Sequence, residues 1–225
     1  MELLNYKKKL DLKNPSPMAK ENQIKLINQK LSEYSHSLLS SDHDPLFLVE
    51  QSDLVNICKI LKTDNELDYS ILIDICAVDY LTYGQADWVT NEATKTGYSR
   101  AVQQKIIADD DDEFPDRFAI FYQLLSITNN SRISLKTFTT KLNPPSVPSI
   151  NKIWNSANWF EREAFDLMGV HFKGHPDLRR ILTDYGFIGH PFRKDFPTNG
   201  NLEVIYDEDE EKVVYKPVSI TTRPS

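Results

Sequence analysis

Cysteine is scarce in this chain of 225 residues, which contains only Cys58 and Cys76. An iron–sulfur cluster or a zinc ribbon normally takes four ligands in closely spaced pairs. Two thiols this far apart do not supply such a set, so the sequence argues against both kinds of centre. We expect both cysteines to be reduced residues of the core in a non-oxidising compartment.

Long apolar runs are missing as well. The most hydrophobic stretch, Ile71–Val78, is short and contains Asp74, whereas a membrane-spanning helix needs about 20 apolar residues. The N-terminal segment has no apolar stretch followed by a small-residue cleavage site, so we expect no secretory signal. If the protein works at a membrane, it does so by binding another protein.

Glycine is also rare, and the sequence lacks an excess of positive charge. None of the seven glycines forms GxGxxG, GxxxxGK[ST] or GxSxG, which argues against nucleotide-binding loops and a serine nucleophile. The formal net charge is −7. Because nucleic-acid binding depends on clustered lysine and arginine, we expect no nucleic-acid partner.

Hydrophobic periodicity predicts a mixture of helices and strands. Helices are expected over Ala19–Leu39, from the cap Ser52 along a face of Leu54, Ile57, Cys58 and Leu61, and from a cap at Ser156 or Asn158 to a left-handed cap at Gly169. Strands are expected at Leu46–Val49, at 71–78 with both faces buried, and at Phe118–Ile127 and Ile133–Phe138, which a hairpin turn joins. This order favours an α+β fold, with a two-layer domain of helices on a mixed β-sheet and a long extended C-terminal tail.

The same pass along the chain divides it into three regions. Residues 1–45 form an N-terminal helical extension, 46–169 an α/β core domain with a surface insertion near 84–115, and 170–225 an extended interface tail. The insertion carries the acidic run Asp109–Glu113. A solvated loop is the simpler interpretation of that run, and a docking strip for a basic partner is the alternative.

Carboxylates on the last predicted helix raise the possibility of acid–base catalysis. Glu163 and Asp166 share a face, and Glu161 precedes them. However, Arg162 and the arginines at 179, 180 and 193 are available counter-charges, and a guanidinium lowers the pKa of a neighbouring carboxyl. A carboxyl with a low pKa is a poor general acid at neutral pH. We therefore predict structural ion pairs here, and no catalytic residue in the chain.

Histidines in the same region raise the possibility of a metal site. His171 and His175 are four positions apart, as zinc ligands on a helix are, and His190 offers a third ring. Gly174 and Pro176 prevent a regular helix through the pair. Neither an HExxH motif nor a cysteine partner accompanies them, so we predict no metal site.

The composition of residues 159–196 is better explained by a protein interface. Two His-Pro pairs, at 175–176 and 190–191, fix tight extended turns, and arginines and aromatic side chains gather around them. Such residues dominate binding energy at interfaces. The predicted interface residues are Glu161, Arg162, Glu163, Asp166, His175, Arg179, Arg180, His190, Arg193, Lys194 and Asp195. A second interpretation stays open, in which these residues pin the tail to its own domain.

These residues also form a recognisable motif. Glu161-Arg-Glu163 and Asp166 are followed by the run His175-Pro-Asp-Leu-Arg-Arg-Ile-Leu182, and then by Gly189-His-Pro191 and Arg193-Lys-Asp-Phe-Pro197. In these motifs the chain resembles the thirty-kilodalton subunit of respiratory complex I, the proton-pumping NADH:quinone oxidoreductase, which in bacteria is called the C subunit. The resemblance runs from about residue 70 to about residue 216 except for the insertion, and Phe192 stands where leucine is usual.

The resemblance implies a structural subunit without catalytic residues. It would belong to the peripheral arm of the complex and pack against the forty-nine-kilodalton subunit and other arm subunits near the quinone site. The enzyme activity, NADH:ubiquinone reduction with proton translocation, would belong to the whole complex. FMN, iron–sulfur clusters and ubiquinone would be held by other subunits, with no cofactor in this chain and membrane association only through the complex.

Two alternatives accompany this interpretation. One is a related subunit of a membrane-bound hydrogenase complex. The other is a proton relay through His175 or His190 near the quinone site, for which the near-neutral pKa of histidine is suited. The Asn-, Lys- and Ile-rich composition favours an AT-rich genome, so we expect the matrix face of the mitochondrial inner membrane, with the cytoplasmic face of a bacterial membrane as the alternative.

Overall fold

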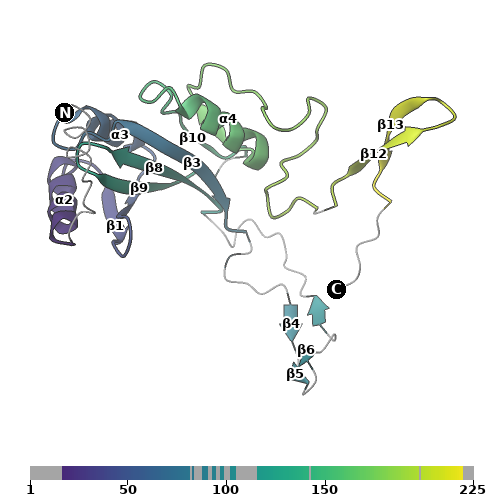
Figure 1. Cartoon of the computed structure of the whole chain (residues 1–225), viewed down its shortest axis with the longest axis horizontal. Coiled ribbons are helices and arrows are strands. Elements are labelled where there is room, and N and C mark those ends of the chain that lie inside the picture. Colours follow the sequence, from purple (N-terminus) through teal and green to yellow (C-terminus); the bar gives the residue numbers. More distant parts are fainter. Residues whose placement is uncertain are drawn as a thin grey trace, which may run out of the picture.

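A computed structural model describes residues 17–81, 83, 88–90, 93–94, 97–98, 102–104, 116–141, 143–197 and 199–219 (Figure 1). Its helices are α2 (Pro17–Lys30), α3 (Leu54–Thr63) and α4 (Ala157–Met168). Its strands are β1 (His36–Ser40), β2 (Leu46–Val49), β3 (Ile71–Asp79), β4 (Trp88–Thr90), β5 (Ala93–Thr94), β6 (Gly97–Tyr98), β7 (Val102–Gln104), β8 (Phe118–Ser126), β9 (Ser131–Phe138), β10 (Ser146–Pro148), β11 (His171–Lys173), β12 (Leu202–Asp207) and β13 (Lys212–Pro217). The acidic run 109–113 lies outside the described residues.

Five strands form the main sheet, in the order β1-β2-β9-β8-β3. β2 and β9 are parallel, whereas the other neighbours are antiparallel, so the sheet is mixed as predicted. β8 and β9 form the predicted hairpin, in which Leu124 lies opposite Ile133. The α+β class is therefore confirmed.

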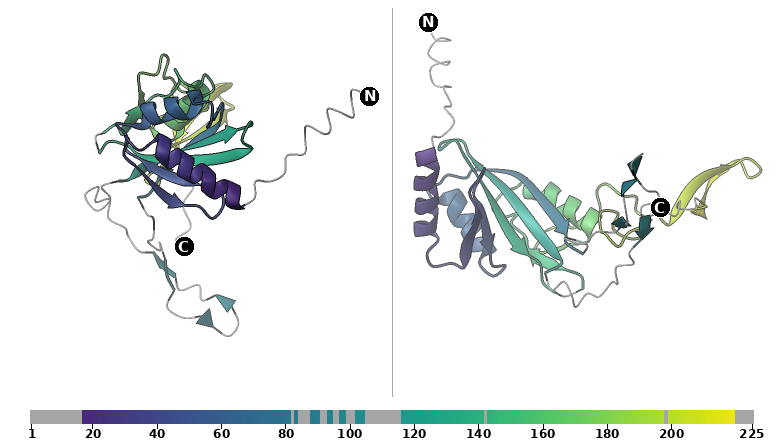
Figure 2. Two further views of the ribbon diagram at one scale, coloured as in Figure 1. Left: turned by 90° about the vertical axis from the view of Figure 1, so that its left-hand side faces the viewer. Right: turned by 90° about the horizontal axis from the view of Figure 1, so that it is seen from below.

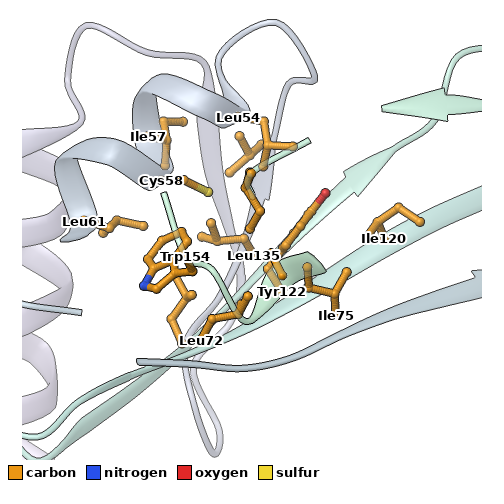
Figure 3. Packing of buried hydrophobic residues seen from close by; sticks show 14 of the residues in the cluster. Leu54, Ile57, Cys58, Leu61, Leu72, Ile75, Ile120, Tyr122, Leu135 and Trp154 are labelled. Atoms are coloured by element: carbon orange, nitrogen blue, oxygen red, sulfur yellow. The ribbon is translucent and has the colours of Figure 1, made fainter. Parts of the chain in front are cut away.

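Helices α3 and α4 cover one face of this sheet, so the domain has two layers (Figure 2). The predicted stripe on α3, with Leu54, Ile57 and Leu61, is completely buried. These side chains meet Tyr122 and Leu135 from the sheet in the core that Figure 3 shows. Each such aliphatic side chain stabilises the fold by about 1.5–3 kcal/mol when it is fully buried, so this layer contact holds the domain together.

β3 departs from the prediction of a strand buried on both faces. Leu72 and Ile75 are buried under the helices, but Ile73 is 40% exposed and Cys76 is exposed too. The run of apolar residues did not reveal that the second face of the sheet lacks a covering layer among the described residues. The predictions of a doubly buried strand and of a core position for Cys76 are wrong, while Cys58 is buried.

The helix predicted over 19–39 is shorter than expected. α2 ends at Lys30, with Ile27 and Leu31 buried, and the chain then turns into β1. His36–Ser40 pairs with β2, which gives its backbone groups partners across the sheet. Sheet pairing therefore overrides the apparent helical spacing of Leu38, which is 40% exposed.

The helix ends agree only partly with the predicted caps. Asp53, not Ser52, is the N-cap residue of α3, and its carboxylate accepts the N–H of Ser35 at 2.9 Å. Ser156 is the N-cap residue of α4, without a side-chain cap hydrogen bond. Gly169 ends α4 in the left-handed conformation, with φ of +71°, which confirms the predicted C-terminal cap.

Beyond α4 the chain first returns to the domain and then leaves it. β11 pairs in parallel with β10, which lies in the proline-rich stretch before α4. The described residues of 174–201 form turns and bends, and β12 and β13 then pair as an antiparallel hairpin. Figure 1 shows this hairpin, in yellow, at the opposite end of the molecule from α2. The hairpin was not predicted.

Candidate functional site

Asp166, in the last turn of α4, is the main attachment point of the tail. Its Oδ2 accepts the backbone N–H groups of Ile181, Leu182 and Thr183 at 3.0, 2.7 and 2.8 Å. Its Oδ1 accepts Arg180 Nη1 at 2.9 Å and also the Thr183 hydroxyl. Burial by itself raises the pKa of this carboxyl, but the bonds from Thr183, Leu182 and Ile181 hold the pKa well below its usual range.

Arg162 lies one helical turn before Asp166 and binds the other kind of backbone group. Its Nε donates to the carbonyl of Arg179 at 3.1 Å, and its Nη2 donates to the carbonyl of Arg180 at 3.3 Å. Arg162 thus donates to carbonyls of the segment 179–183, and Asp166 accepts from amides of the same segment. The i, i+4 spacing on α4 places both side chains on the same face.

Residues 190–193 satisfy the open end of α4. A helix leaves its last carbonyls without helical partners. The His190 Nδ1–H donates to the carbonyl of Asp166 at 2.8 Å, the Phe192 N–H to that of Leu167 at 3.0 Å, and Arg193 Nε to that of Met168 at 2.7 Å. The tail therefore supplies donors to the three carbonyls that the cap at Gly169 leaves without partners.

This close approach requires glycine at the end of the helix. A Cβ at Gly169 would lie 2.5 Å from Arg193 Nη2 and 2.6 Å from the His190 ring. Its φ of +71° would also strain any other residue. Gly169 therefore both ends the helix and admits the two side chains that cap it.

A second attachment point holds the tail to the end of β3. Arg117 donates to Asp79 through Nε and Nη2 at 2.9 and 3.0 Å, and Nη2 also reaches Asp195 Oδ2 at 2.8 Å. The backbone N–H of Lys194 donates to Asp79 Oδ2 at 2.9 Å. Burial raises the pKa of Asp79, but the bonds from Arg117, Lys194 and Leu81 lower it further than burial raises it.

Most predicted interface residues thus meet within the chain. Arg162, Asp166, Arg180, His190 and Arg193 form the first attachment point, where Arg180 Nη2 also reaches the carbonyl of Gly189 at 3.0 Å. These contacts correspond to the interpretation in which the residues pin the tail to its own domain. A role of the same residues toward a partner stays a prediction.

Three predicted residues do not join this network through their side chains. Glu163 and the side chain of Lys194 are exposed. Arg179 Nε lies 3.0 Å from Asp177 Oδ2, but both side chains are more than half exposed, so this pair contributes little to stability. These three side chains are exposed to solvent and do not hold the tail to the domain.

Glu161 corrects the prediction that the carboxylates of α4 form ion pairs with arginine. Its Oε2 accepts the Ser149 hydroxyl at 2.6 Å, and its Oε1 accepts the N–H of Ile150 at 2.8 Å. Its nearest possible cation is the ring of His175, with Nε2 4.0 Å from Oε2. Burial raises the pKa of Glu161 to about 7, against the lowering effect of the bonds from Ser149 and Ile150. The argument that arginine lowers this pKa is wrong.

Asp79, Arg117 and Thr183 are site residues that we did not predict. The sequence signals are weak: Asp79 ends one apolar strand, Arg117 precedes another, and Thr183 directly follows the motif that ends at Leu182. Nothing in the sequence connects Asp79 with Lys194, which is 115 positions later. Contacts of this range need the fold to be known.

The histidines considered as metal ligands lie apart. His171 is exposed on β11, the side chain of His175 is buried, and His190 is bound to the end of α4. In the described parts of the chain, no three His, Cys, Asp or Glu residues are grouped as metal ligands. Over the same residues, no helix is long and apolar enough to cross a membrane.

Comparison with solved structures supports the fold. A chain of the membrane-bound sulfane sulfur reductase, an archaeal respiratory membrane complex, superposes with a TM-score of 0.55 over 86% of this chain and 98% of its own length. Sequence identity is only 20%, so this likeness concerns the fold alone. Fold and site together define an α+β domain that pins a C-terminal segment onto its last helix.

Sequence comparison identifies the family. Residues 47–202 match the family model of the 30 kDa subunit of respiratory-chain NADH dehydrogenase. The C subunit of NADH-quinone oxidoreductase from Coxiella burnetii is 45% identical over 204 residues, which are 91% of this chain and 89% of the relative. The C subunits from Hydrogenovibrio crunogenus and Legionella pneumophila are 48% and 45% identical, over 78% and 89% of this chain and 79% and 87% of the relatives. The chain belongs to this family, as the sequence motifs indicated.

Proposed function

We propose that the chain is a structural subunit of the peripheral arm of a NADH-quinone oxidoreductase, and that residues 170–219 bind its neighbours in that complex. The membership in the family supports the first part. The observation that carries the second part is the β12–β13 hairpin, which presents an apolar face without a core behind it.

One face of the hairpin is wholly apolar, whereas the other carries the charged pairs Glu203–Lys216 and Asp207–Lys212 on either side of the apolar pair Ile205–Val214. Cross-strand pairing puts Leu202, Val204, Tyr206, Val213, Tyr215 and Pro217 on one face. Val204 and Tyr215 are opposite each other and are 62% and 63% exposed. An isolated two-stranded hairpin is marginally stable in water, and exposed apolar patches mark interaction sites. A neighbouring protein of the complex that covers this face stabilises the hairpin.

The segment between the attachment points adds further apolar side chains. Leu182, Ile188 and Phe192 are exposed, and Tyr185 is 92% exposed. Hydrogen bonds hold the backbone at Leu182, at Gly189 beside Ile188, and at Phe192, so these parts of the segment are held in place before a partner binds. Pre-organisation of this kind lowers the entropy cost of association.

The contacts of the arginines within their own chain revise the predicted chemistry of the interface. Arg180 and Arg193 already bond to acceptors of their own chain, and they position the segment. We infer that the surface offered to the partner is mainly apolar and aromatic, with exposed Glu163, Arg179 and Lys194 at its rim. The forty-nine-kilodalton subunit is the partner that the family resemblance implies, and we keep it as our proposal.

We place the protein at a bacterial membrane, on the cytoplasmic side and attached only through the complex. The similar proteins named above come from bacteria, so the mitochondrial placement expected from composition has no support from them. Their names also favour NADH-quinone oxidoreductase over a membrane-bound hydrogenase complex. In this proposal the activity belongs to the complex, and the chain carries neither a catalytic residue nor a cofactor.

The proposal of a histidine proton relay is not favoured by the ring environments. His190 uses Nδ1–H to cap α4, and burial, Arg193 and Arg180 lower its pKa. Burial also lowers the pKa of His175. Nδ1 of His190 is bound to a backbone carbonyl, and Nδ1 of His175 accepts the N–H of Asp177 at 3.1 Å, so we assign both rings positions in the fold rather than in a relay.

A test uses the two faces of the hairpin as experiment and control. The double variant Val204→Ser with Tyr215→Ser alters the apolar face, and Glu203→Gln with Lys216→Gln alters the opposite face at neighbouring positions. We expect the first to lower the amount of tagged chain that co-purifies with the detergent-solubilised complex by about thirtyfold, since interface anchors contribute about 2 kcal/mol or more. The second should assemble normally. Normal assembly of the first variant in native gels would refute the hairpin as an interface.

A further inference from the structure

Glu161 is buried without a compensating cation. Its side chain is 0% exposed, and it is bound by Ser149 and by the N–H of Ile150. Among the residues that the structure describes, no lysine or arginine forms an ion pair with it. A carboxylate in such a place is costly in its charged form. The site therefore favours a proton on or beside this group.

His175 faces this carboxyl from the first turn of the tail. Its side chain is also 0% exposed, and the N–H of Asp177 donates to its Nδ1 at 3.1 Å. Because Nδ1 accepts that bond, the neutral ring carries its hydrogen on Nε2. Nε2 is buried, has no hydrogen-bond partner among the described residues, and lies 4.0 Å from Glu161 Oε2. Among the described residues, the unsatisfied Nε2 of this ring thus lies near a buried carboxyl that has no lysine or arginine partner.

We propose that Glu161 and His175 form a buried proton-holding pair that joins α4 to the first turn of the tail, and that loss of the retained proton opens this turn. Two arrangements of the pair are neutral overall, namely a protonated carboxyl with a neutral ring, and a carboxylate with a protonated ring. Removing the proton leaves a bare negative charge in a dry site. Water can reach that charge only when the turn moves away.

The groups around the pair decide where the proton lies. On the Glu161 side are Cys58 of α3 and Tyr122 of β8, whose pKa values are raised mainly by burial, so neither offers a charge that would stabilise the carboxylate. On the His175 side Arg162 opposes a positive ring, whereas Asp177 and the backbone of Asn158 favour it. Burial and Arg162 prevail, which places the proton mainly on Glu161.

The turn that the pair closes leads directly into the first attachment point. The N–H of His175 donates to the carbonyl of Phe172 at 3.2 Å, and Asp177 is bound by the ring itself. Arg179 and Arg180, whose carbonyls Arg162 binds, follow within a few residues. Loss of the proton therefore opens the first turn of the tail, residues 172–177. Asp166 still holds residues 181–183.

The test is amide hydrogen exchange of the full chain at pH 6 and pH 8, expressed as protection factors so that the intrinsic pH dependence of exchange is removed. One proton linked to opening changes the opening equilibrium by up to about tenfold per pH unit between the ordinary pKa of the carboxyl, 4.5, and its raised pKa of about 7, and by little above that. We expect protection of the Asp177 amide to fall about tenfold between these pH values. The Leu182 amide, which Asp166 binds, should change less than about twofold.

Matched variants separate the pair from general effects of charge. Glu161→Gln should remove the pH dependence at Asp177, and His175→Gln should weaken protection at both pH values. The controls are Glu163→Gln, two positions away but exposed, and His171→Gln, an exposed histidine of the same region. Both controls should keep the behaviour of the unmodified chain.

A second measurement follows the titration of the carboxyl itself. Carbon-13 NMR of the side-chain carboxyls in the unmodified chain should show one glutamate that titrates near neutral pH and that is absent in Glu161→Gln. Titration of every glutamate below about pH 5 would overturn the proposal. So would equal loss of protection at Asp177 in the unmodified chain and in Glu161→Gln. Neither measurement involves the complex, so failure here is separate from failure of the proposed function.

Discussion

The two buried carboxyls of helix α4 have pKa values that are shifted in opposite directions. Glu161, in the first half, and Asp166, in the last turn, both have side chains that are 0% exposed. Burial raises the pKa of Glu161 to about 7, whereas hydrogen bonds hold the pKa of Asp166 far below its usual range. The difference lies in the donors, since Asp166 meets three amides, a hydroxyl and a guanidinium.

This comparison shows that burial alone does not decide the charge of a carboxyl. Both groups lose water, but only at Asp166 do backbone N–H groups of the tail replace it. The charged end of α4 therefore depends on the tail, and the neutral half depends on the core.

The largest effect is expected at Asp166. In Asp166→Ala the amides of Ile181, Leu182 and Thr183 and the charge of Arg180 lose their acceptor, which should lower the free energy of unfolding by about 3–5 kcal/mol. Urea unfolding measures the loss, and limited proteolysis should cut within 174–196. Glu163→Ala, on the exposed side of α4, should change stability by less than about 0.5 kcal/mol. Equal losses in the two variants would contradict the account.

A smaller effect with a defined pH dependence is expected for Glu161→Gln. The pKa of this acid is raised on folding, so the folded chain binds the proton more tightly, and stability falls as pH rises from the ordinary pKa of 4.5 to about 7. The variant has no proton to lose and should be more stable than the unmodified chain at pH 8, by up to about 3 kcal/mol. At pH 4 the advantage should vanish. Thermal unfolding at both pH values measures this, and a constant difference would refute it.

At the glycine cap the expected effect is the difference in stability between two glycine variants. Gly169→Ala adds a Cβ that meets Arg193 and His190, whereas Gly174→Ala, also at positive φ, meets nothing within 4 Å. Backbone strain of about 1–2 kcal/mol is common to both. The capping contacts should add about 1–3 kcal/mol for Gly169→Ala only. Equal losses in the free energy of unfolding, measured by chemical denaturation, would show that Arg193 and His190 do not restrict a side chain at position 169.

The smallest effect is expected at Arg179. Its pair with Asp177 is exposed, so Arg179→Ala should change the free energy of unfolding by less than about 0.5 kcal/mol. In contrast Arg180→Ala removes donors to Asp166, Thr183 and Gly189 and should be clearly destabilising in the same urea titration. A comparable loss at the two neighbouring arginines would mean that the contacts of Arg180 carry little energy.

Local patterns predicted the elements whose own periodicity is strong. The stripe of Leu54, Ile57 and Leu61 and the cap at Gly169 follow from spacing and backbone preference, which depend on near neighbours. The exposed face of β3 depends on which layer lies opposite, and the pairing of β1 depends on the strand beside it, so the sequence did not reveal them.

The candidate site could be predicted only by residue type. The composition of residues 159–196 pointed to interface residues that the structure does bring together, namely Arg162, Asp166, Arg180, His190 and Arg193. It did not indicate whether each carboxyl would meet a donor. Glu161 was assigned a guanidinium because four arginines are near in sequence, yet in the described part of the chain none of them pairs with it, and its neighbours are Ser149 and the ring of His175.

The cap that residues 190–193 place on α4 affects how the protein is made. During synthesis the final turn of that helix emerges more than twenty residues before the groups that cap it. Until those groups emerge, the carbonyls of residues 166–168 lack their hydrogen-bond donors in the nascent domain. A fragment that stops at residue 169 would retain this defect permanently. Expression trials that trim the protein to its apparent globular part should therefore keep the chain through Phe196.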